Sequence, residues 1–332
     1  MQTISVNVMN LCVPCACRCR HCLLAWDGRV TGAEDARAQA YARSFRDWLG
    51  EKRPELSFLY GFGYAMEHPH LMAAIEFCRE MGSPTAEFLQ LNGMRMRTAP
   101  ELVALLTEAK AHGVRLIDLT FYGTEAAHDA FAGRKGDFRL LMDTLRAAQE
   151  AGLSAAVDMP LTAENAHLAL PLLEAVASFA PASTRLYVPH SEGRGQSLAT
   201  VRLTGRCLSQ LPEEVRRRVN RQTFRTEAEW LRTDFPAPTR RVITLTLTAA
   251  SIARWEQTPF DETIACLEAL DDAYYAALPP LPELAARYGD PAGDGLYSLR
   301  DLAMTWERRF IADHRLSLHD IHDERGCFAR RL

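Results

Sequence analysis

The chain has 332 residues, of which 48% are hydrophobic and 24% charged, and its formal net charge is −4. It is long enough to bury one large core or two unequal ones, and it has no basic excess that would favour nucleic acid as a partner. No apolar run approaches the roughly 18–20 residues of a membrane-spanning helix, and the first thirty residues show no signal-peptide pattern. We therefore expect a cytoplasmic protein that acts away from membranes and whose thiols stay reduced.

Short apolar and amphipathic runs alternate along the first 190 residues. Runs typical of strands lie at residues 4–9, 56–61, 87–93, 115–123, 154–161 and 184–189. Helical patterns lie between them, at residues 33–49, 71–81, 99–112, 138–151 and 163–178. Strands separated by helices imply parallel βαβ units, which predicts the α/β class. A doubly wound sheet and a full or partial barrel both satisfy this pattern.

The pattern changes after about residue 200. Residues 212–224 predict a charged helix, and residues 241–247 form an isolated strand-like run. Helical patterns dominate the rest, at residues 261–277, 281–288 and 299–314. Without a low-complexity linker between them, the two parts are expected to pack against each other.

Five of the nine cysteines lie in the stretch CVPCACRCRHC, from Cys12 to Cys22. A zinc site would pair Cys12 and Cys15 with Cys19 and Cys22, but only three residues separate these pairs, whereas zinc sites place about a dozen or more between them. The alternative takes Cys15, Cys19 and Cys22 as thiolate ligands of an iron–sulfur cluster. Three ligands on four irons leave one iron open to another molecule.

The string CACRCRHC resembles the C-x3-C-x2-C signature of the radical S-adenosylmethionine (radical SAM) enzymes, which also follows a first strand. The segments LQLNGM (89–94), LTFYGTEAAHDAFAGRKGDF (119–138), LTAEN (161–165) and EGRG (192–195) resemble segments of that family in the same order. The resemblance covers about residues 1–200. It implies a partial (β/α)6 TIM-like parallel barrel in which Cys15, Cys19 and Cys22 hold a [4Fe–4S] cluster. It also implies reductive cleavage of S-adenosylmethionine to a 5′-deoxyadenosyl radical that abstracts hydrogen from a substrate.

The same resemblance implies a set of residues that bind the cofactor: Gly63, Tyr64, Asn92, Thr120 and Arg194. One position departs from the family, which commonly carries G-G-E-P after the second strand, with the acid holding the amino group of S-adenosylmethionine. Here the sequence is YGFGYAMEHPHL, and Tyr64 stands at the acidic position. Glu67 is an alternative anchor, unless it caps the next helix.

Several polar residues are expected to point into the barrel, because alternate side chains of barrel strands face inward. They are Gln90, Asn92, Asp118, Thr120, Tyr122, Asp158 and Arg185. Each can instead bond a loop at the end of its strand, but as sets they predict a lined cavity.

Other conspicuous residues are expected to be structural. Cys12 and Cys17 exceed the three-cysteine motif, and both are expected to pack. His128 and Asp129 are expected to have a structural role on the connection after the fourth strand. The motif HDIHD, at residues 319–323, is interpreted as a solvated tail, with a metal site as the alternative.

We predict a radical SAM core over residues 1–200. Residues 201–332 are predicted to be a helical region that closes the barrel and shapes the substrate pocket. The substrate is a small molecule or a peptide, and the reaction after hydrogen abstraction stays open. An electron donor such as flavodoxin or ferredoxin is expected to dock on Arg18, Arg20 or the basic helix at residues 213–221. The alternatives are a non-catalytic iron–sulfur and S-adenosylmethionine sensor, and an enzyme that transfers an aminocarboxypropyl group.

Overall fold

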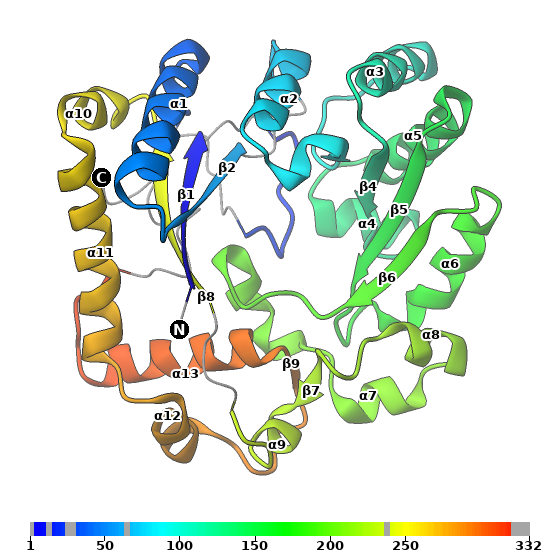
Figure 1. Ribbon diagram of the computed structural model, residues 1–332. Helices are drawn as coiled ribbons and strands as arrows, with labels where there is room; N and C mark the ends of the chain where they lie inside the picture. The colour runs from blue at the N-terminus through cyan, green and yellow to red at the C-terminus, as the bar shows by residue number, and fades with distance from the viewer. Residues whose placement is uncertain (1–2, 11–14, 24–30, 63–66, 236–239, 320–332) are drawn as a thin grey trace.

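The computed structural model of the protein describes residues 3–10, 15–23, 31–62, 67–235 and 240–319. Two parallel sheets form its centre (Figure 1). The first has the order β2-β1-β8 and consists of β1 (Thr3–Asn10), β2 (Ser57–Phe62) and β8 (Arg240–Leu247). The second has the order β3-β4-β5-β6 and consists of β3 (Phe88–Gln90), β4 (Leu116–Thr120), β5 (Ser154–Pro160) and β6 (Ser183–Tyr187).

The predicted α/β class is confirmed, and all six predicted strands are present. Strand β3 is shorter than predicted, since the chain turns at Gly93 with a φ of +87°. Among the described residues β2 and β3 do not pair, so these strands form a partial barrel and not a closed one.

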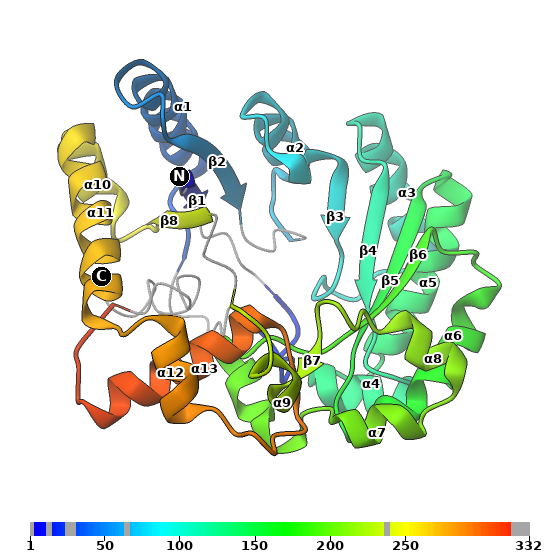
Figure 2. The same cartoon turned by 60° about the horizontal axis from the view of Figure 1, so that its bottom comes forward.

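Helices cover the outer side of the strands (Figures 1 and 2). They are α1 (Asp35–Lys52), α2 (Leu71–Glu80), α3 (Ala99–Ala111), α5 (Asp137–Ala151) and α6 (Ala169–Ala177). Helix α4 (Glu125–Ala132) instead lies at the carboxyl ends of the strands and packs against α5 (Figure 2). Each buries an apolar stripe; in α1 the stripe includes Ala38, Tyr41, Phe45 and Leu49, at helical spacing. Helix α4 was not predicted, because its eight residues are too few for a clear period.

Strand β8 lies far from β1 in sequence but pairs with it in parallel over the whole length of β1. The run at residues 241–247 is therefore not isolated: it is an edge of the sheet whose central strand leads into the cysteine loop. Helices α10 (Ile252–Gln257) and α11 (Phe260–Ala277) follow it, and their apolar residues join the core of this sheet. Residues after 200 thus contribute to the sheet itself.

The remaining elements form the lower part of the molecule in Figure 1. They are α7 (Gly205–Gln210), α8 (Glu213–Arg218), β7 (Arg225–Thr226), α9 (Glu227–Trp230), α12 (Leu281–Tyr288), β9 (Leu296–Tyr297) and α13 (Leu299–Asp313). The charged helix predicted at 212–224 ends early at Arg218, and Asn220 then accepts hydrogen bonds from the backbone of Gln222 and Thr223 in a turn. In the described part of the chain, no helix is long and apolar enough to cross a membrane.

Candidate cofactor and substrate cavity

A cavity of about 350 Å³ lies between the cysteine loop and the strands β3 to β6. Its walls come from the cysteine loop, from the carboxyl-terminal halves of the strands and from the segments that follow them. The residues that line it are Cys15, Cys17, Cys19, His21, Cys22, Leu23, Gln90, Asn92, Gly93, Thr120, Tyr122, Asp158, Arg185, Tyr187, His190, Arg194 and Phe224. This is the end of a parallel sheet at which ligands of α/β proteins bind.

The thiols of Cys15, Cys19 and Cys22 all line this cavity and are partly exposed. A hydrogen bond from Cys17 lowers the pKa of Cys15 to about 7 against the effect of burial, and it lowers the pKa of Cys19 as well. Hydrogen bonding with Cys15 and Cys19 raises the pKa of Cys17. These directions favour the thiolate form, which binds metals, at Cys15 and Cys19 and disfavour it at Cys17.

No three His, Cys, Asp or Glu side chains of the described residues are grouped closely enough to hold one metal ion. A four-iron cluster has a different requirement, because each thiolate binds its own iron and the ligands surround the cluster. The donor set of three thiols on one loop, facing one cavity, fits such a cluster.

Backbone hydrogen bonds fix the cysteine loop to two neighbouring segments. Ala16 N donates to Gly93 O over 2.7 Å, and Arg18 N donates to Ala132 O, at the end of α4, over 2.8 Å. Gly93 has a positive φ, and a Cβ at this position would overlap the Cys15 thiol. A glycine is therefore required at the place where the loop crosses the end of β3.

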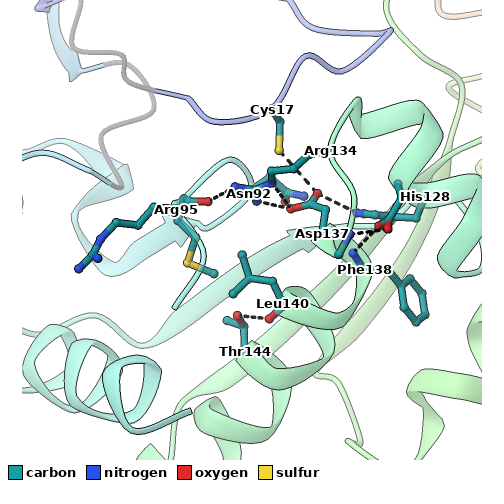
Figure 3. A network of polar contacts seen from close by, with 12 residues as sticks. Cys17, Asn92, Arg95, His128, Arg134, Asp137, Phe138, Leu140 and Thr144 are labelled. Atoms are coloured by element: carbon teal, nitrogen blue, oxygen red, sulfur yellow. Dashed lines mark hydrogen bonds and ion pairs between the residues drawn. The ribbon is translucent and has the colours of Figure 1, made fainter. Parts of the chain in front are cut away.

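A buried network below the loop connects it to α4 and α5 (Figure 3). The carboxylate of Asp137 accepts from His128 Nε2 over 2.9 Å, pairs with Arg134 and lies 3.6 Å from the Cys17 thiol. Arg134 also donates to Met94 O. Burial opposes ionisation of Asp137, but the hydrogen bonds from His128 and Arg134 outweigh it and hold its pKa below the usual value.

The network gives His128 the structural role that the sequence predicted. Its ring is fully buried, and its Nδ1 accepts from the backbone N of Tyr122 over 3.2 Å. Asp129 accepts from the backbone N of Gly136 and of Phe138 at the start of α5. Sequence reasoning did not single out Arg134 or Asp137; the signal available for Asp137 was an acid in the first turn of a helix.

Asn92 and Thr120 lie side by side at the ends of β3 and β4. The Asn92 amide donates to Thr120 O and accepts from Thr120 N, both over 2.7 Å. Both residues line the cavity, but the Asn92 side chain is engaged in joining the two strands. Arg194 also lines the cavity, and its backbone N donates to Cys22 O over 3.0 Å.

Two of the residues predicted to bind S-adenosylmethionine have a placement that is not described. Gly63 and Tyr64 lie outside the described residues, as do Cys12 and most of the HDIHD motif. Glu67 is described, and it binds Arg97 over 2.6 Å and the backbone N of Arg95 over 2.7 Å. It does not cap the next helix, whose N-cap is His70. The helix-cap interpretation of Glu67 is therefore wrong, because two arginines attract its carboxylate toward residues 95–97.

Three charged residues that the sequence placed inside the barrel meet on β4, β5 and β6. Arg185 binds Asp158 with Nε over 2.7 Å and with Nη2 over 2.6 Å, and the same Nη2 donates to Asp118 over 2.9 Å. Desolvation and the charge of Asp158 raise the pKa of Asp118 to about 7. Desolvation also raises the pKa of Asp158 although Arg185 opposes it.

The segment after β6 is held by helix α13. His190 lines the cavity, and its Nδ1 lies 3.2 Å from Asp301, which also accepts from the backbone N of Ser191 over 2.9 Å. The hydrogen bond to Asp301 raises the pKa of His190. Arg202 donates to the Ser191 hydroxyl over 2.6 Å. Sequence reasoning missed His190, since its partner lies 111 positions away.

The basic residues considered for docking are partly paired. Arg20 binds Glu164 over 2.6 Å, with 44% and 49% of the two side chains exposed. On α8, Arg217 and Arg218 pair with Glu213 and Glu214. Such exposed pairs leave the surface near neutral and contribute little to stability.

No family model and no curated protein matches this chain. Similar solved structures include anSMEcpe with bound AdoMet, with a TM-score of 0.39 and 12% identity over 56% of this chain and 52% of that chain. SuiB of Streptococcus suis bound to S-adenosylmethionine gives a TM-score of 0.36 and 12% identity over 57% of this chain and 39% of that one. Coproporphyrinogen III oxidase (HemN) from Escherichia coli gives 0.44 and 11% over 93% and 91%.

HemN is described as a radical SAM enzyme, the family whose cysteine motif this chain resembles. The present chain spans about half the length of anSMEcpe, the first of these structures. With TM-scores below 0.5 and identities of 11–12%, these similarities are distant ones of fold, and the function has to follow from the residues of the cavity.

Proposed function

We propose that the protein is a radical SAM enzyme whose [4Fe–4S] cluster is held by Cys15, Cys19 and Cys22. The observation that carries the proposal is that these three thiols, spaced C-x3-C-x2-C on one loop, face a single cavity. When bound, such a cluster supplies an electron and one open iron for the amino and carboxylate groups of S-adenosylmethionine. The outcome is reductive cleavage to a 5′-deoxyadenosyl radical, which abstracts hydrogen from a small molecule or a peptide.

The protein's own residues would bind and enclose the reactants. Thr120 and Arg194 line the cavity beside the cysteines, where a hydroxyl and a guanidinium can bind the ribose and the carboxylate of the cofactor. Gly63 and Tyr64 are proposed to contact the cofactor as well. Tyr122 and Phe224 supply aromatic walls that exclude water from a reactive intermediate. An electron donor such as flavodoxin or ferredoxin completes the proposal.

The contacts of Glu67 are the reason to keep a second candidate function, that of a sensor. Two arginines engage it, and Tyr64 stands at the family's usual acidic position, so Glu67 is not free to hold the amino group of S-adenosylmethionine. A protein that binds the cluster and the cofactor as a sensor, without cleaving the cofactor, is therefore the alternative. Transfer of an aminocarboxypropyl group is a third outcome, which breaks a different bond of the sulfonium.

The test is anaerobic reconstitution with iron and sulfide, followed by S-adenosylmethionine and dithionite. Iron content, the visible absorption spectrum and 5′-deoxyadenosine by mass spectrometry are measured. Cys19→Ala should lose the cluster and the product, whereas the matched variant Cys266→Ala, in helix α11 away from the cavity, should keep both.

The product decides among the candidates. 5′-Deoxyadenosine that requires Cys19 supports the radical enzyme. A stable four-iron cluster with intact S-adenosylmethionine would support the sensor, and 5′-methylthioadenosine would support aminocarboxypropyl transfer. Equal iron content in Cys19→Ala and Cys266→Ala would contradict the proposed ligand set.

A further inference from the structure

Asp118, Asp158 and Arg185 form one group of charges on three neighbouring strands. Strand pairing places Asp158 next to Arg185, and the guanidinium of Arg185 reaches across to Asp118 over 2.9 Å. Asp158 and Arg185 line the cavity, whereas Asp118 is 1% exposed and lies behind them. The group lies earlier along its strands than the cavity residues Tyr122 and His190.

One oxygen of this group has no hydrogen-bond partner in the described part of the chain. Asp118 Oδ2 accepts from Arg185, but Asp118 Oδ1 is buried and unpartnered. A buried acceptor without a donor costs about 1–3 kcal/mol, so each such atom requires an explanation. Because this oxygen lies behind the cavity wall, it acts on a ligand in the cavity through its negative charge.

The group also has more negative than positive charge. A single guanidinium faces two carboxylates, and among the described residues no other cationic side chain bonds to either carboxylate. Desolvation raises the pKa of both acids, that of Asp118 to about 7, which shows that Arg185 compensates them incompletely. An additional positive charge would be stabilised here, and an additional negative charge would not.

We propose that Asp158, with the buried charge of Asp118 behind it, forms a substrate subsite that binds a protonated amine. The substrate is then an amine, or a peptide or amino acid with a basic side chain. An ammonium group has three donors and no acceptor, so it can donate to Asp158 at the cavity wall, and the charge of Asp118 behind Asp158 attracts it further. Gln90, which is in register with Asp118 on β3 and lines the cavity, offers an amide oxygen as a further acceptor.

This inference rests on the proposed function in one respect, namely that the bound amine is the substrate. Binding itself is independent of the cluster. Isothermal titration of the full chain at neutral pH, with and without reconstituted iron, would use three probes of equal length: n-butylamine, butyrate and 1-butanol. The amine is expected to bind, and the other two are not.

Three variants make the test specific. Asp158→Asn should weaken n-butylamine at least tenfold, since it removes a charge at nearly constant shape. Arg185→Gln should tighten it several-fold, because a competing cation is removed; loss of folding cannot produce this result. Asp143→Asn, an exposed acid on α5, is the matched control and should leave binding unchanged. Circular dichroism verifies the fold of each variant.

Several results would overturn the proposal. They are binding of butyrate in place of the amine, absence of amine binding, and equal amine affinity in the wild type and in Asp158→Asn. Displacement of n-butylamine by S-adenosylmethionine would assign the subsite to the cofactor and also overturn it, whereas simultaneous binding of both supports it. Amine binding by a protein that forms no cluster on reconstitution would refute the proposed function alone, and 5′-deoxyadenosine without amine binding would refute this inference alone.

Discussion

The protein contains two groups of aspartate and arginine that differ in how well their charges match. Below the cysteine loop, the carboxylate of Asp137 accepts hydrogen bonds from both His128 and Arg134 (Figure 3). In the cavity, two carboxylates, Asp118 and Asp158, share the single Arg185. Both carboxylate oxygens of Asp137 accept hydrogen bonds, whereas Oδ1 of Asp118 has no donor among the described residues.

The two groups respond to burial in opposite directions. The pKa of Asp137 is lowered although the side chain is fully buried, whereas that of Asp118 is raised to about 7. Arg134 is 13% exposed, and Arg185 is 58% exposed. Aspartate and arginine thus stabilise the fold where all their hydrogen bonds are made within the protein. Where some of these hydrogen bonds are missing, the same residue types are available to a ligand.

Asp137→Asn is expected to have the largest effect, because it removes a buried charge that pairs with Arg134 and accepts a hydrogen bond from His128. The loss in the free energy of unfolding should be about 3–5 kcal/mol, measured by urea denaturation. Asp143→Asn on the same helix removes an exposed acid paired with Arg146 and should cost under about 1 kcal/mol. Similar losses in the two variants would contradict the comparison.

Asp118→Asn is expected to change how stability depends on pH. Between the usual aspartate pKa and about 7, native Asp118 keeps a proton that the unfolded chain has lost, so wild-type stability falls as pH rises through this window and levels off above it. The neighbouring charges that set this value are Asp158 and Arg185. The variant lacks this fall, which amounts to about 4 kcal/mol for such a shift. Urea denaturation at pH 4, 5.5 and 8 measures it; parallel pH profiles for both proteins would refute it.

Gly93→Ala tests how the buried network around Asp137 connects to the cysteine loop, since Arg134 donates to the carbonyl of Met94, next to Gly93. The positive φ should cost about 1–2 kcal/mol, and the new methyl group should displace Cys15. We expect a lower urea midpoint and less iron after reconstitution. Gly50→Ala in α1, where a Cβ meets no atom within 4 Å, should instead stabilise the protein by about 0.5–1 kcal/mol and leave iron unchanged.

Arg185→Gln should have the smallest effect on stability, about 1 kcal/mol at neutral pH, because the Arg185 side chain is more than half exposed. Arg134→Gln should cost more, since it leaves Asp137 and the Met94 carbonyl with fewer donors in a buried position. Urea denaturation of the two variants side by side checks the order. A larger loss in Arg185→Gln would mean that the cavity group is structural.

Local patterns were sufficient to predict the strands of the first 190 residues and the segment that faces the cavity. Short apolar runs identify β1 to β6, and cysteine spacing identifies the loop, because both depend on neighbours in sequence. The inward positions of Asp158 and Arg185 followed from alternation along a strand, and both line the cavity.

Contacts between distant segments could not be predicted in this way. The pairing of β8 with β1, the support of His190 by Asp301 and the engagement of Glu67 by Arg97 join residues 30 to more than 200 positions apart. One sequence contains no periodic signal for such pairs. The match of charges in the Asp137 and Asp118 groups likewise depends on which helices and strands meet.

The pairing of β8 with β1 also constrains when the protein can mature. Asn7 and Thr244 lie on adjacent strands and are 237 positions apart. During synthesis the cysteines leave the ribosome long before residues 240–247, at about 5–20 residues per second. Until then, β1 can pair only with β2, and the sheet that leads into the cysteine loop is incomplete. Uptake of iron and sulfide for the proposed cluster is therefore expected only after residues 240–247 have emerged, and a nascent chain stalled before residue 240 should take up no iron.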